Sequence, residues 1–185
     1  MPPEEPPPER IIASRRIHEG RIVNLRDDTI ERPDGQRSRR EVVEHAPVVA
    51  IVPIDSAGQV VLVKQYRLPA GQALLEVPAG GIEPGETVEE AAQRELQEET
   101  GLRAGRLFRL GGFYVSPGYC DEFIHLLLAL DLTPSPIDGD EDERITVVRL
   151  PLEEALRLVE LEEIKDSKSI IGLLWADRRL AHLSP

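Results

Sequence analysis

The chain has 185 residues, of which 41% are hydrophobic and 30% are charged, and its formal net charge is −12. This length and composition predict a globular protein with one principal domain. The excess of acidic residues argues against a nucleic-acid partner, because surfaces that bind nucleic acid need basic residues to displace counterions from the phosphates. The single cysteine, Cys120, excludes an internal disulfide and is typical of a cytoplasmic protein. Apolar runs are too short to cross a bilayer, so we expect no membrane partner.

Residues 1–10 are rich in proline and glutamate and predict a disordered tail rather than a signal peptide. Residues 11–46 predict a small antiparallel β region. Two strands, residues 16–31 and 39–45, flank Pro33-Asp34-Gly35-Gln36, whose Asp-Gly step favours a tight turn. A hairpin of this size is marginal alone, so we expect it to dock on another surface.

Residues 47–185 predict an α/β domain. Two segments rich in Val, Ile and Leu, residues 46–54 and 59–66, predict a second hairpin that turns at residues 55–58 and has central strands covered on both faces. Further strands are predicted over residues 74–77, 107–115, 122–130 and 145–150, and C-terminal helices over residues 151–160 and 167–180. Because helices and strands interleave without regular alternation, we expect a mixed sheet between helices.

Residues 80–102, GGIEPGETVEEAAQRELQEETGL, predict a turn followed by one helix. Thr87 and Glu90 form a capping box for a helix that begins at Val88. Gly101 supplies a left-handed C-terminal cap. The segment is unusual because it has few apolar residues and many glutamates.

Helical spacing places Glu95 and Glu99 in the middle of the apolar stripe and Glu98 at its edge. The stripe itself comprises Val88, Ala91, Ala92 and Leu96, and the residues expected to face water are Glu89, Glu90, Gln93, Gln97 and Thr100. Two carboxylates about 4 Å apart repel by roughly 4 kcal/mol at an effective dielectric near 20. A divalent cation would remove this conflict, and carboxylate ligands suit Mg²⁺, with Mn²⁺ as a substitute. Arg94 would hold Glu98 through an i,i+4 pair. The alternative is a solvated, glutamate-rich surface helix.

The spacing of Gly80, Glu86, Arg94-Glu95-Leu96, Glu98-Glu99 and Gly101-Leu102 resembles the signature of the Nudix hydrolases. This resemblance implies a Nudix-type α/β/α sandwich whose loop and helix bind a divalent metal and a nucleoside diphosphate linked to another group. Three flanking features make the chain most similar to the ADP-ribose pyrophosphatases of that family: Gln65-Tyr66-Arg67, Ser116-Pro117-Gly118 and the acidic residues 140–143.

Roles for individual residues follow from the resemblance alone. It implies metal binding by the Ala79 carbonyl, Glu95, Glu98 and Glu99. It implies substrate binding by Arg67 at the diphosphate, Glu122 at a ribose hydroxyl, and Arg40, Pro117 and Gly118. The catalytic set would be Glu141 as the base, Glu143 as the second choice for it, Glu95 and Arg94. A mobile acidic loop suits the base, because its carboxylate reaches the attacking water without being locked among the metal ligands.

The resemblance implies Mg²⁺-dependent hydrolysis of ADP-ribose to AMP and ribose 5-phosphate. Two alternatives stay open: hydrolysis of another nucleoside diphosphate sugar such as GDP-mannose, and a non-catalytic sensor of nucleotide sugars on the same fold. Similar enzymes exchange the N-terminal region across a two-fold homodimer, which we therefore expect here. Relatives carry an aromatic residue after the glycine of His18-Glu19-Gly20 to stack on adenine, whereas this chain has Arg21-Ile22. An arginine can also stack on a base.

Overall fold

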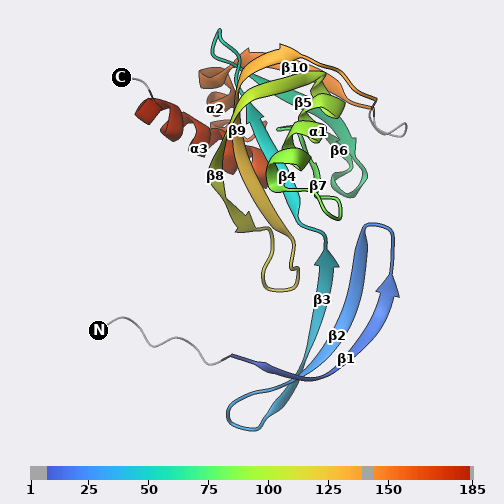
Figure 1. Ribbon diagram of the computed structural model, residues 1–185. Helices are drawn as coiled ribbons and strands as arrows, with labels where there is room; N and C mark the ends of the chain where they lie inside the picture. The colour runs from blue at the N-terminus through green and yellow to red at the C-terminus, as the bar shows by residue number, and fades with distance from the viewer. Residues whose placement is uncertain (1–7, 139–143, 184–185) are drawn as a thin grey trace. The chain divides into compact units, whose positions relative to one another are not determined.

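The structure, a computed structural model, describes residues 8–138 and 144–183. The chain divides into two compact units (Figure 1). The first runs as far as Ala46 and also includes the distant segment Tyr114–Phe123. The second consists of Pro47–Phe113 and the chain from Ile124 onward. The signature segment therefore lies wholly in the second unit.

The first unit is an antiparallel sheet with the strand order β1-β2-β3. The strand bounds are β1 Arg10–Glu19, β2 Val23–Glu31 and β3 Arg37–His45. The single strand expected over residues 16–31 is wrong, because the chain reverses at Gly20, whose N–H donates to the Val23 carbonyl at 3.1 Å. The turn expected at Asp34-Gly35 is confirmed, and Gly35 adopts the left-handed φ of 79° that this turn requires.

Backbone hydrogen bonds join the segment Tyr114–Phe123 to the end of β3. The Val43 N–H donates to the Tyr119 carbonyl at 2.7 Å, and the Asp121 N–H donates to the Val43 carbonyl at 3.1 Å. The Asp121 carboxylate also accepts the His45 N–H at 2.9 Å. These bonds explain why a segment far along the chain packs with the N-terminal strands.

The second unit contains two sheets. The mixed sheet has the order β7-β4-β9-β8, with β4 parallel to β9 and antiparallel to β7, and the antiparallel sheet has the order β10-β5-β6. The strand bounds are β4 Val48–Pro53, β5 Gln59–Arg67, β6 Gln72–Glu76, β7 Ala79–Gly81, β8 Leu102–Tyr114, β9 Phe123–Pro134 and β10 Thr146–Pro151. The expected hairpin of β4 with β5 is wrong. The turn at Asp55–Gly58 forms, with the Gly58 N–H donating to the Asp55 carbonyl at 3.0 Å, but the two strands enter different sheets and share only the bridge Ile54–Val60.

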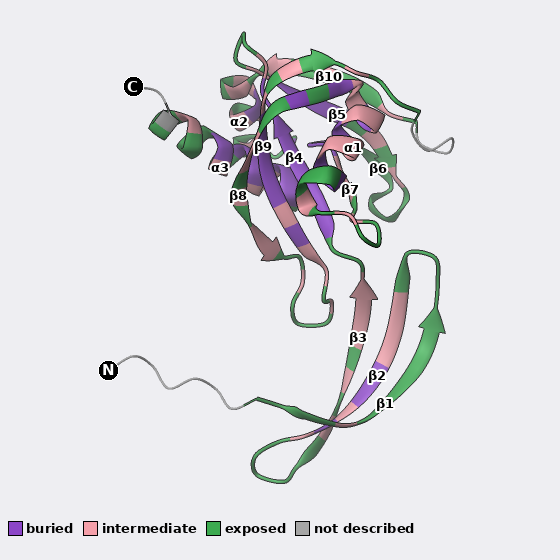
Figure 2. Ribbon diagram, viewed as in Figure 1, coloured by how far each residue is buried: buried purple, intermediate pink, exposed green. Residues whose placement is uncertain are grey.

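Strand β4 is buried over its whole length, as expected, because helices cover both of its faces (Figure 2). Successive residues of a strand point to opposite sides. Val48, Ala50 and Val52 pack in one apolar cluster with Leu173 and Ala176 of α3 (Ser167–Leu183). Val49 and Ile51 pack in the other cluster with Ala91, Ala92 and Leu96 of α1 (Val88–Thr100). The expected α/β/α sandwich is therefore confirmed.

Helix α1 begins and ends where the sequence predicts. The Thr87 hydroxyl accepts the Glu90 N–H at 3.2 Å, and the Glu90 carboxylate accepts the Thr87 N–H at 2.8 Å, so the capping box is complete. Gly101 ends the helix with a left-handed φ of 71°, and its N–H donates to the Gln97 carbonyl at 2.9 Å. Local sequence thus sets both ends of the helix that carries the glutamates.

Two helices complete the second unit. Helix α2 spans Leu152–Glu160, with Pro151 as its N-cap residue. Helix α3 is capped by Asp166, whose carboxylate accepts the Ser169 N–H at 3.0 Å. None of the helices in residues 8–138 and 144–183 combines the length and the hydropathy that a membrane span requires.

Candidate active site

The signature loop, residues 82–87, leads from the short strand β7 directly to the glutamate-bearing helix α1. Strand β7 pairs with β4, and the Ile82 N–H then donates to the Pro47 carbonyl at 3.0 Å. Between Glu83 and Glu86 the loop turns tightly: the Glu86 N–H donates to the Glu83 carbonyl at 3.0 Å, and Gly85 has a φ of 93°. The loop is therefore held at both ends, and it delivers the chain to the N-terminus of α1.

The carboxylate of Glu95 lies directly against the backbone of β7. A Cβ atom added at Gly80 would lie only 2.1 Å from Oε1 of Glu95. Any side chain at this position would occupy the space that the carboxylate now fills. Gly80 is therefore needed for Glu95 to reach the strand, which gives a physical reason for glycine at the start of the signature.

Arg94 connects the loop to two glutamates of α1. Its Nη1 donates to Glu95 at 2.6 Å and to Glu98 at 3.0 Å, so the expected i,i+4 contact is present. Its Nε and Nη2 donate to Glu86 at 2.8 and 2.9 Å, and Nη2 also donates to the Gly81 carbonyl at 2.8 Å. These bonds raise the pKa of the Arg94 guanidinium, with the Glu86 bond as the largest cause. Arg94 therefore remains charged and orients both glutamates.

Glu86 orients Arg94, a role that our sequence reasoning did not assign. The hydrogen bond from Arg94, together with a backbone hydrogen bond involving Glu83, lowers the pKa of Glu86 from 4.5 to about 2. A carboxylate this acidic stays ionised throughout the neutral range. The sequence did contain a signal for this role, because Glu86 is one of the fixed positions of the signature. A fixed position that is occupied by a charged residue suggests a specific polar contact.

Glu99 is the most deeply buried of the three predicted metal-binding glutamates. The residue is 7% exposed, and its Oε2 accepts the Ala79 N–H at 3.2 Å. The side chains of Glu95 and Glu98 are 12% and 24% exposed. The expectation that Glu95 and Glu99 turn inward is confirmed. The alternative, a glutamate-rich helix that is fully solvated, is wrong.

Two glutamines that we expected to face water are instead bonded within the unit. The Gln93 amide donates to the Ala104 carbonyl at 2.7 Å and accepts the Ala104 N–H at 3.0 Å. The Gln97 amide donates to the Ser135 carbonyl at 2.9 Å. The expectation was wrong because periodicity locates the main apolar contact of a helix, whereas neighbouring strands can also reach its flanks.

A cavity of about 410 Å³ lies between the signature loop and α1. The predicted ligands Ala79, Glu95 and Glu98 line it together with Arg94, beside Gly80–Pro84. Within residues 8–138 and 144–183, no three acidic, histidine or cysteine side chains converge in a geometry that holds an ion. The donor chemistry nevertheless fits a hard cation: carboxylates approach a glycine-lined strand with a carbonyl, and one arginine offsets only part of their charge.

Arg67, the residue predicted to meet the diphosphate, lies at the end of β5 and is bound to Glu76. Nε and Nη2 of Arg67 donate to the two oxygens of Glu76, each at 2.9 Å. Burial alone would raise the pKa of Glu76, but Arg67 and Lys168 outweigh it and hold the pKa below 4.5. Sequence reasoning missed both Glu76 and Lys168, because they are 92 residues apart and share no local pattern.

Arg40, Pro117 and Gly118 line one cavity of about 390 Å³ within the first unit. The exposed rings of Tyr114 and Tyr119 also line it. The Arg40 guanidinium donates to the carboxylate of Glu9, through Nε at 3.1 Å. The structure thus brings together three of the predicted substrate-binding residues and adds two aromatic faces to them.

The remaining predicted residues lie elsewhere. Glu122 is half-buried in the segment between β8 and β9, where its carbonyl accepts the Val115 N–H at 3.2 Å. It does not line the cavity that contains Arg40. Glu141 and Glu143 lie outside the described residues, so their role as base stays a prediction.

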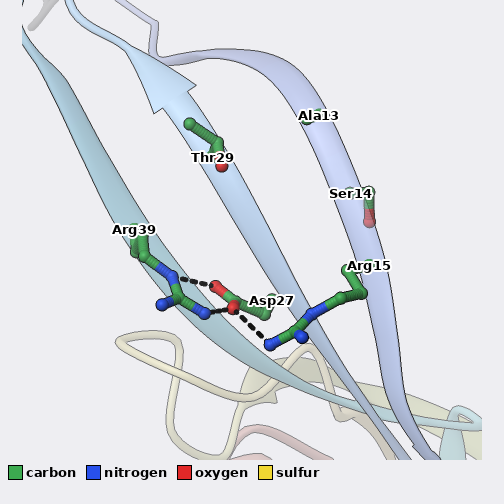
Figure 3. A pocket seen from close by; sticks show the side chains of 6 residues that line it. All are labelled: Ala13, Ser14, Arg15, Asp27, Thr29 and Arg39. Atoms are coloured by element: carbon green, nitrogen blue, oxygen red, sulfur yellow. Dashed lines mark hydrogen bonds and ion pairs between the residues drawn. The ribbon is translucent and has the colours of Figure 1, made fainter.

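A third cavity, of about 430 Å³, lies on the N-terminal sheet and contains none of the predicted site residues. Figure 3 shows the buried Asp27 between Arg39 and Arg15. Asp27 accepts from Nε of Arg39 at 3.0 Å and lies 3.6 Å from Arg15. Both arginines therefore already have an anionic partner, and this cavity is explained as a structural ion-pair cluster.

Comparison with known proteins agrees with this geometry. Residues 44–171 match the NUDIX domain, and residues 9–43 match the nucleoside diphosphate sugar hydrolase N-terminal domain. The chain is 40% identical over 169 residues to the ADP-ribose pyrophosphatase of Bacillus subtilis (strain 168), covering 90% of this chain and 91% of that protein. It is equally identical, over the same length and coverage, to a protein of Bacillus methanolicus named methanol dehydrogenase activator.

A solved structure described as an ADP compounds hydrolase superposes with a TM-score of 0.88. It covers 98% of each chain at 27% sequence identity. The contact of Glu95 with Gly80 and the orientation of Glu95 and Glu98 by Arg94 are consistent with the matched domain. This chain belongs to the Nudix hydrolase family.

Proposed function

We propose that this enzyme hydrolyses ADP-ribose to AMP and ribose 5-phosphate with Mg²⁺ as its cofactor. The observation that carries the proposal is the cavity beside α1, where Glu95 lies against Gly80 and Arg94 orients Glu95 and Glu98. The name of the Bacillus subtilis relative supports ADP-ribose as the substrate. Hydrolysis of another nucleoside diphosphate sugar, such as GDP-mannose, is the neighbouring alternative.

The proposed metal ligands are the carboxylates of Glu95, Glu98 and Glu99 and the carbonyl of Ala79. A bound Mg²⁺ would polarise the phosphoryl oxygens and lower the pKa of a bound water. Arg94, held by Glu86, would keep the glutamates at the cavity. Because Arg94 contacts Glu95 and Glu98, metal binding requires these carboxylates to exchange or share that contact.

In the proposed reaction, a water oxygen bonds to one phosphorus of the diphosphate and the bridging P–O bond breaks. The proton of the water passes to the carboxylate of Glu141, or of Glu143 if Glu141 is not the base. Arg67 would offset the charge of the diphosphate, while Arg40, Pro117 and Gly118 would contact the rest of the substrate. Glu122 would accept a hydrogen bond from a ribose hydroxyl.

The exposed tyrosines Tyr114 and Tyr119 offer stacking faces beside Arg40, which could replace the aromatic residue that the chain lacks after Gly20. This part of the proposal has a simple test. Tyr119→Ala should raise KM for ADP-ribose more than it lowers kcat, and unchanged KM in both Tyr114→Ala and Tyr119→Ala would exclude base stacking there.

We further propose that the protein is a homodimer that exchanges its N-terminal region, and that it acts in the cytoplasm. Strand β1 is exposed along almost its whole length, and Ile11, Ile17 and Ile22 expose apolar side chains. A three-stranded sheet with so little buried surface needs a partner surface. Light scattering at several concentrations tests the dimer, and a monomer at all of them would exclude it.

A second candidate function rests on the relative from Bacillus methanolicus, which matches as well as the pyrophosphatase does. The chain would then stimulate a methanol dehydrogenase. Adding the purified chain to such an enzyme, with Glu99→Gln as a comparison, tests this candidate. Absence of any stimulation would remove it.

Product analysis with Mg²⁺ tests the main proposal. The wild type should convert ADP-ribose to equal amounts of AMP and ribose 5-phosphate, and Glu99→Gln should lose at least about a hundredfold in kcat. Glu160→Gln is the matched control, because it removes one exposed carboxylate at the end of α2. Equal turnover by wild type and Glu99→Gln would refute the metal site, and preference for GDP-mannose would establish the neighbouring alternative. Binding of ADP-ribose without turnover would indicate the sensor.

A further inference from the structure

We infer that Glu76 and Lys168 form a buried brace that positions Arg67 to receive the diphosphate of the substrate. The inference rests on the proposed function, because it assigns two further residues to the same site. The brace joins the end of β5, the end of β6 and the first turn of α3. Neither Glu76 nor Lys168 belongs to the signature segment.

Glu76 is a deeply buried carboxylate. It is 1% exposed, and Lys168 is 9% exposed. A buried charge strongly destabilises a fold unless ionic and hydrogen-bonding partners surround it. Glu76 has both: Arg67 binds its two oxygens, and Nζ of Lys168 donates to Oε2. The carboxylate is therefore held in one orientation from two sides.

The contact between Arg67 and Glu76 uses one edge of the guanidinium. Nε and Nη2 each donate at 2.9 Å, so the two groups lie edge to edge. Nη1 makes no hydrogen bond to any residue that the structure describes, and the side chain is 37% exposed. The brace thus fixes the plane of the guanidinium while leaving two of its N–H groups for an anion.

Lys168 has a separate electrostatic role. Without it, Glu76 would neutralise Arg67 and leave little positive charge to attract a phosphate. Lys168 shares Glu76 with Arg67, and it also lies 3.0 Å from Asp166. Lys168 therefore offsets part of the negative charge that Glu76 places beside Arg67, because a second cation interacts with the same carboxylate.

The first turn of α3 is locked to the segment that leads into the active site. Next to Lys168, the buried hydroxyl of Ser169 accepts the Val77 N–H at 2.8 Å. Lys168 and Ser169 of α3 therefore hold Glu76 and Val77, respectively. Val77 precedes Ala79 by two positions. Arg67 also interacts electrostatically with Glu99 of α1. The brace consequently lies beside the proposed metal ligands.

A purely structural ion pair is the competing explanation, and binding measurements separate the two. Isothermal titration calorimetry with ADP-ribose in EDTA, where no turnover occurs, would compare wild type, Glu76→Gln, Arg67→Ala and the double variant. Glu76→Gln keeps the shape of the side chain but removes its charge. The brace predicts about tenfold weaker binding in Glu76→Gln and in Arg67→Ala, with no further loss in the double variant.

The sign of the effect is diagnostic. If Glu76 acted only through its charge, its neutralisation would strengthen the binding of an anion. If it served only stability, Glu76→Gln would lower the melting temperature and leave affinity unchanged. Either result would overturn the inference, as would additive losses in the double variant. Arg106→Gln, which breaks an exposed ion pair with Asp131, is the control and should bind normally.

Lys168 supplies a second set of variants in case Glu76→Gln does not fold. Lys168→Met should weaken ADP-ribose binding in the Arg67 background but not in the Arg67→Ala background, and Lys168→Arg should restore it. A wild type that binds ADP-ribose without hydrolysing it would refute the proposed function and leave the brace to be decided by this cycle. A wild type that binds neither ADP-ribose nor inorganic pyrophosphate would refute the brace.

Discussion

Gly80→Ala should separate activity from stability, because the added methyl group would enter the space that the Glu95 carboxylate occupies. The new Cβ would lie 2.1 Å from Oε1 of Glu95, and real Cβ contacts essentially never fall below 3.0 Å. The carboxylate must therefore move by about 0.9 Å. It is the end of a flexible side chain, and the backbone at Gly80 does not adopt a positive φ. The free energy of unfolding should consequently change by less than about 1 kcal/mol.

The same displacement should strongly impair catalysis. Misplacement by about 1 Å costs on the order of a hundredfold in rate, which corresponds to about 2.7 kcal/mol of transition-state stabilisation. We therefore expect Gly80→Ala to lose about a hundredfold in kcat/KM with ADP-ribose and to bind Mn²⁺ more weakly by calorimetry. Thermal unfolding measured on the same preparation would show that the fold is retained.

The adjacent glycine provides the matched control. A Cβ at Gly81 would meet no atom within 4 Å, although Gly81 is the neighbour of Gly80 in the same strand. Gly81→Ala should therefore keep nearly full activity. Equal activity of Gly80→Ala and Gly81→Ala would refute the conclusion that Gly80 makes room for a functional carboxylate. Equal loss in both would instead indicate a general sensitivity of β7.

Two further predictions concern the helix and its loop. Thr87→Ala removes half of the capping box and should lower the free energy of unfolding by about 1 kcal/mol, measured by urea denaturation at neutral pH. Glu86 has its pKa lowered to about 2 in the folded protein, so its stabilising contribution is complete above about pH 4.5 and is lost as the pH falls towards 2. Glu86→Gln should therefore flatten the decline of stability across that window, and an unchanged pH profile would show that the Arg94–Glu86 contact does not stabilise the fold.

Local sequence determined the features that depend on a few neighbouring residues. The capping box, the left-handed glycine at position 101 and the turn at Asp34-Gly35 were predicted correctly, because each is closed by hydrogen bonds over five residues or fewer. The burial of Glu99 was also predictable from helical periodicity. Periodicity did not reveal that Gln93 and Gln97 bond to other segments, since it contains no information on what lies beside the helix.

The pairing of strands required the tertiary structure. Strands β4 and β5 each contain an apolar run, Val48–Val52 in β4 and Val60–Val63 in β5, and the turn between them forms as expected, yet the strands belong to different sheets. The sheet that each strand joins is decided by partners far along the chain: β9 pairs with β4, and β10 pairs with β5. The break between β1 and β2 was missed for a smaller reason, because no proline and no Asp-Gly or Asn-Gly step marks the point near Gly20 where the backbone reverses.

The sequence by itself determined the family, the position of the acidic helix and the identity of the glutamates that turn inward, since these follow from fixed spacing along one element. Only the tertiary structure showed that Glu95 needs the open space at Gly80, and that Glu76 holds Arg67 with the help of Lys168. The physical reason is the range of the interactions. A helix repeats its contacts every three or four residues, whereas a buried ion pair between residues 76 and 168 exists only after the sheet and the last helix have packed together.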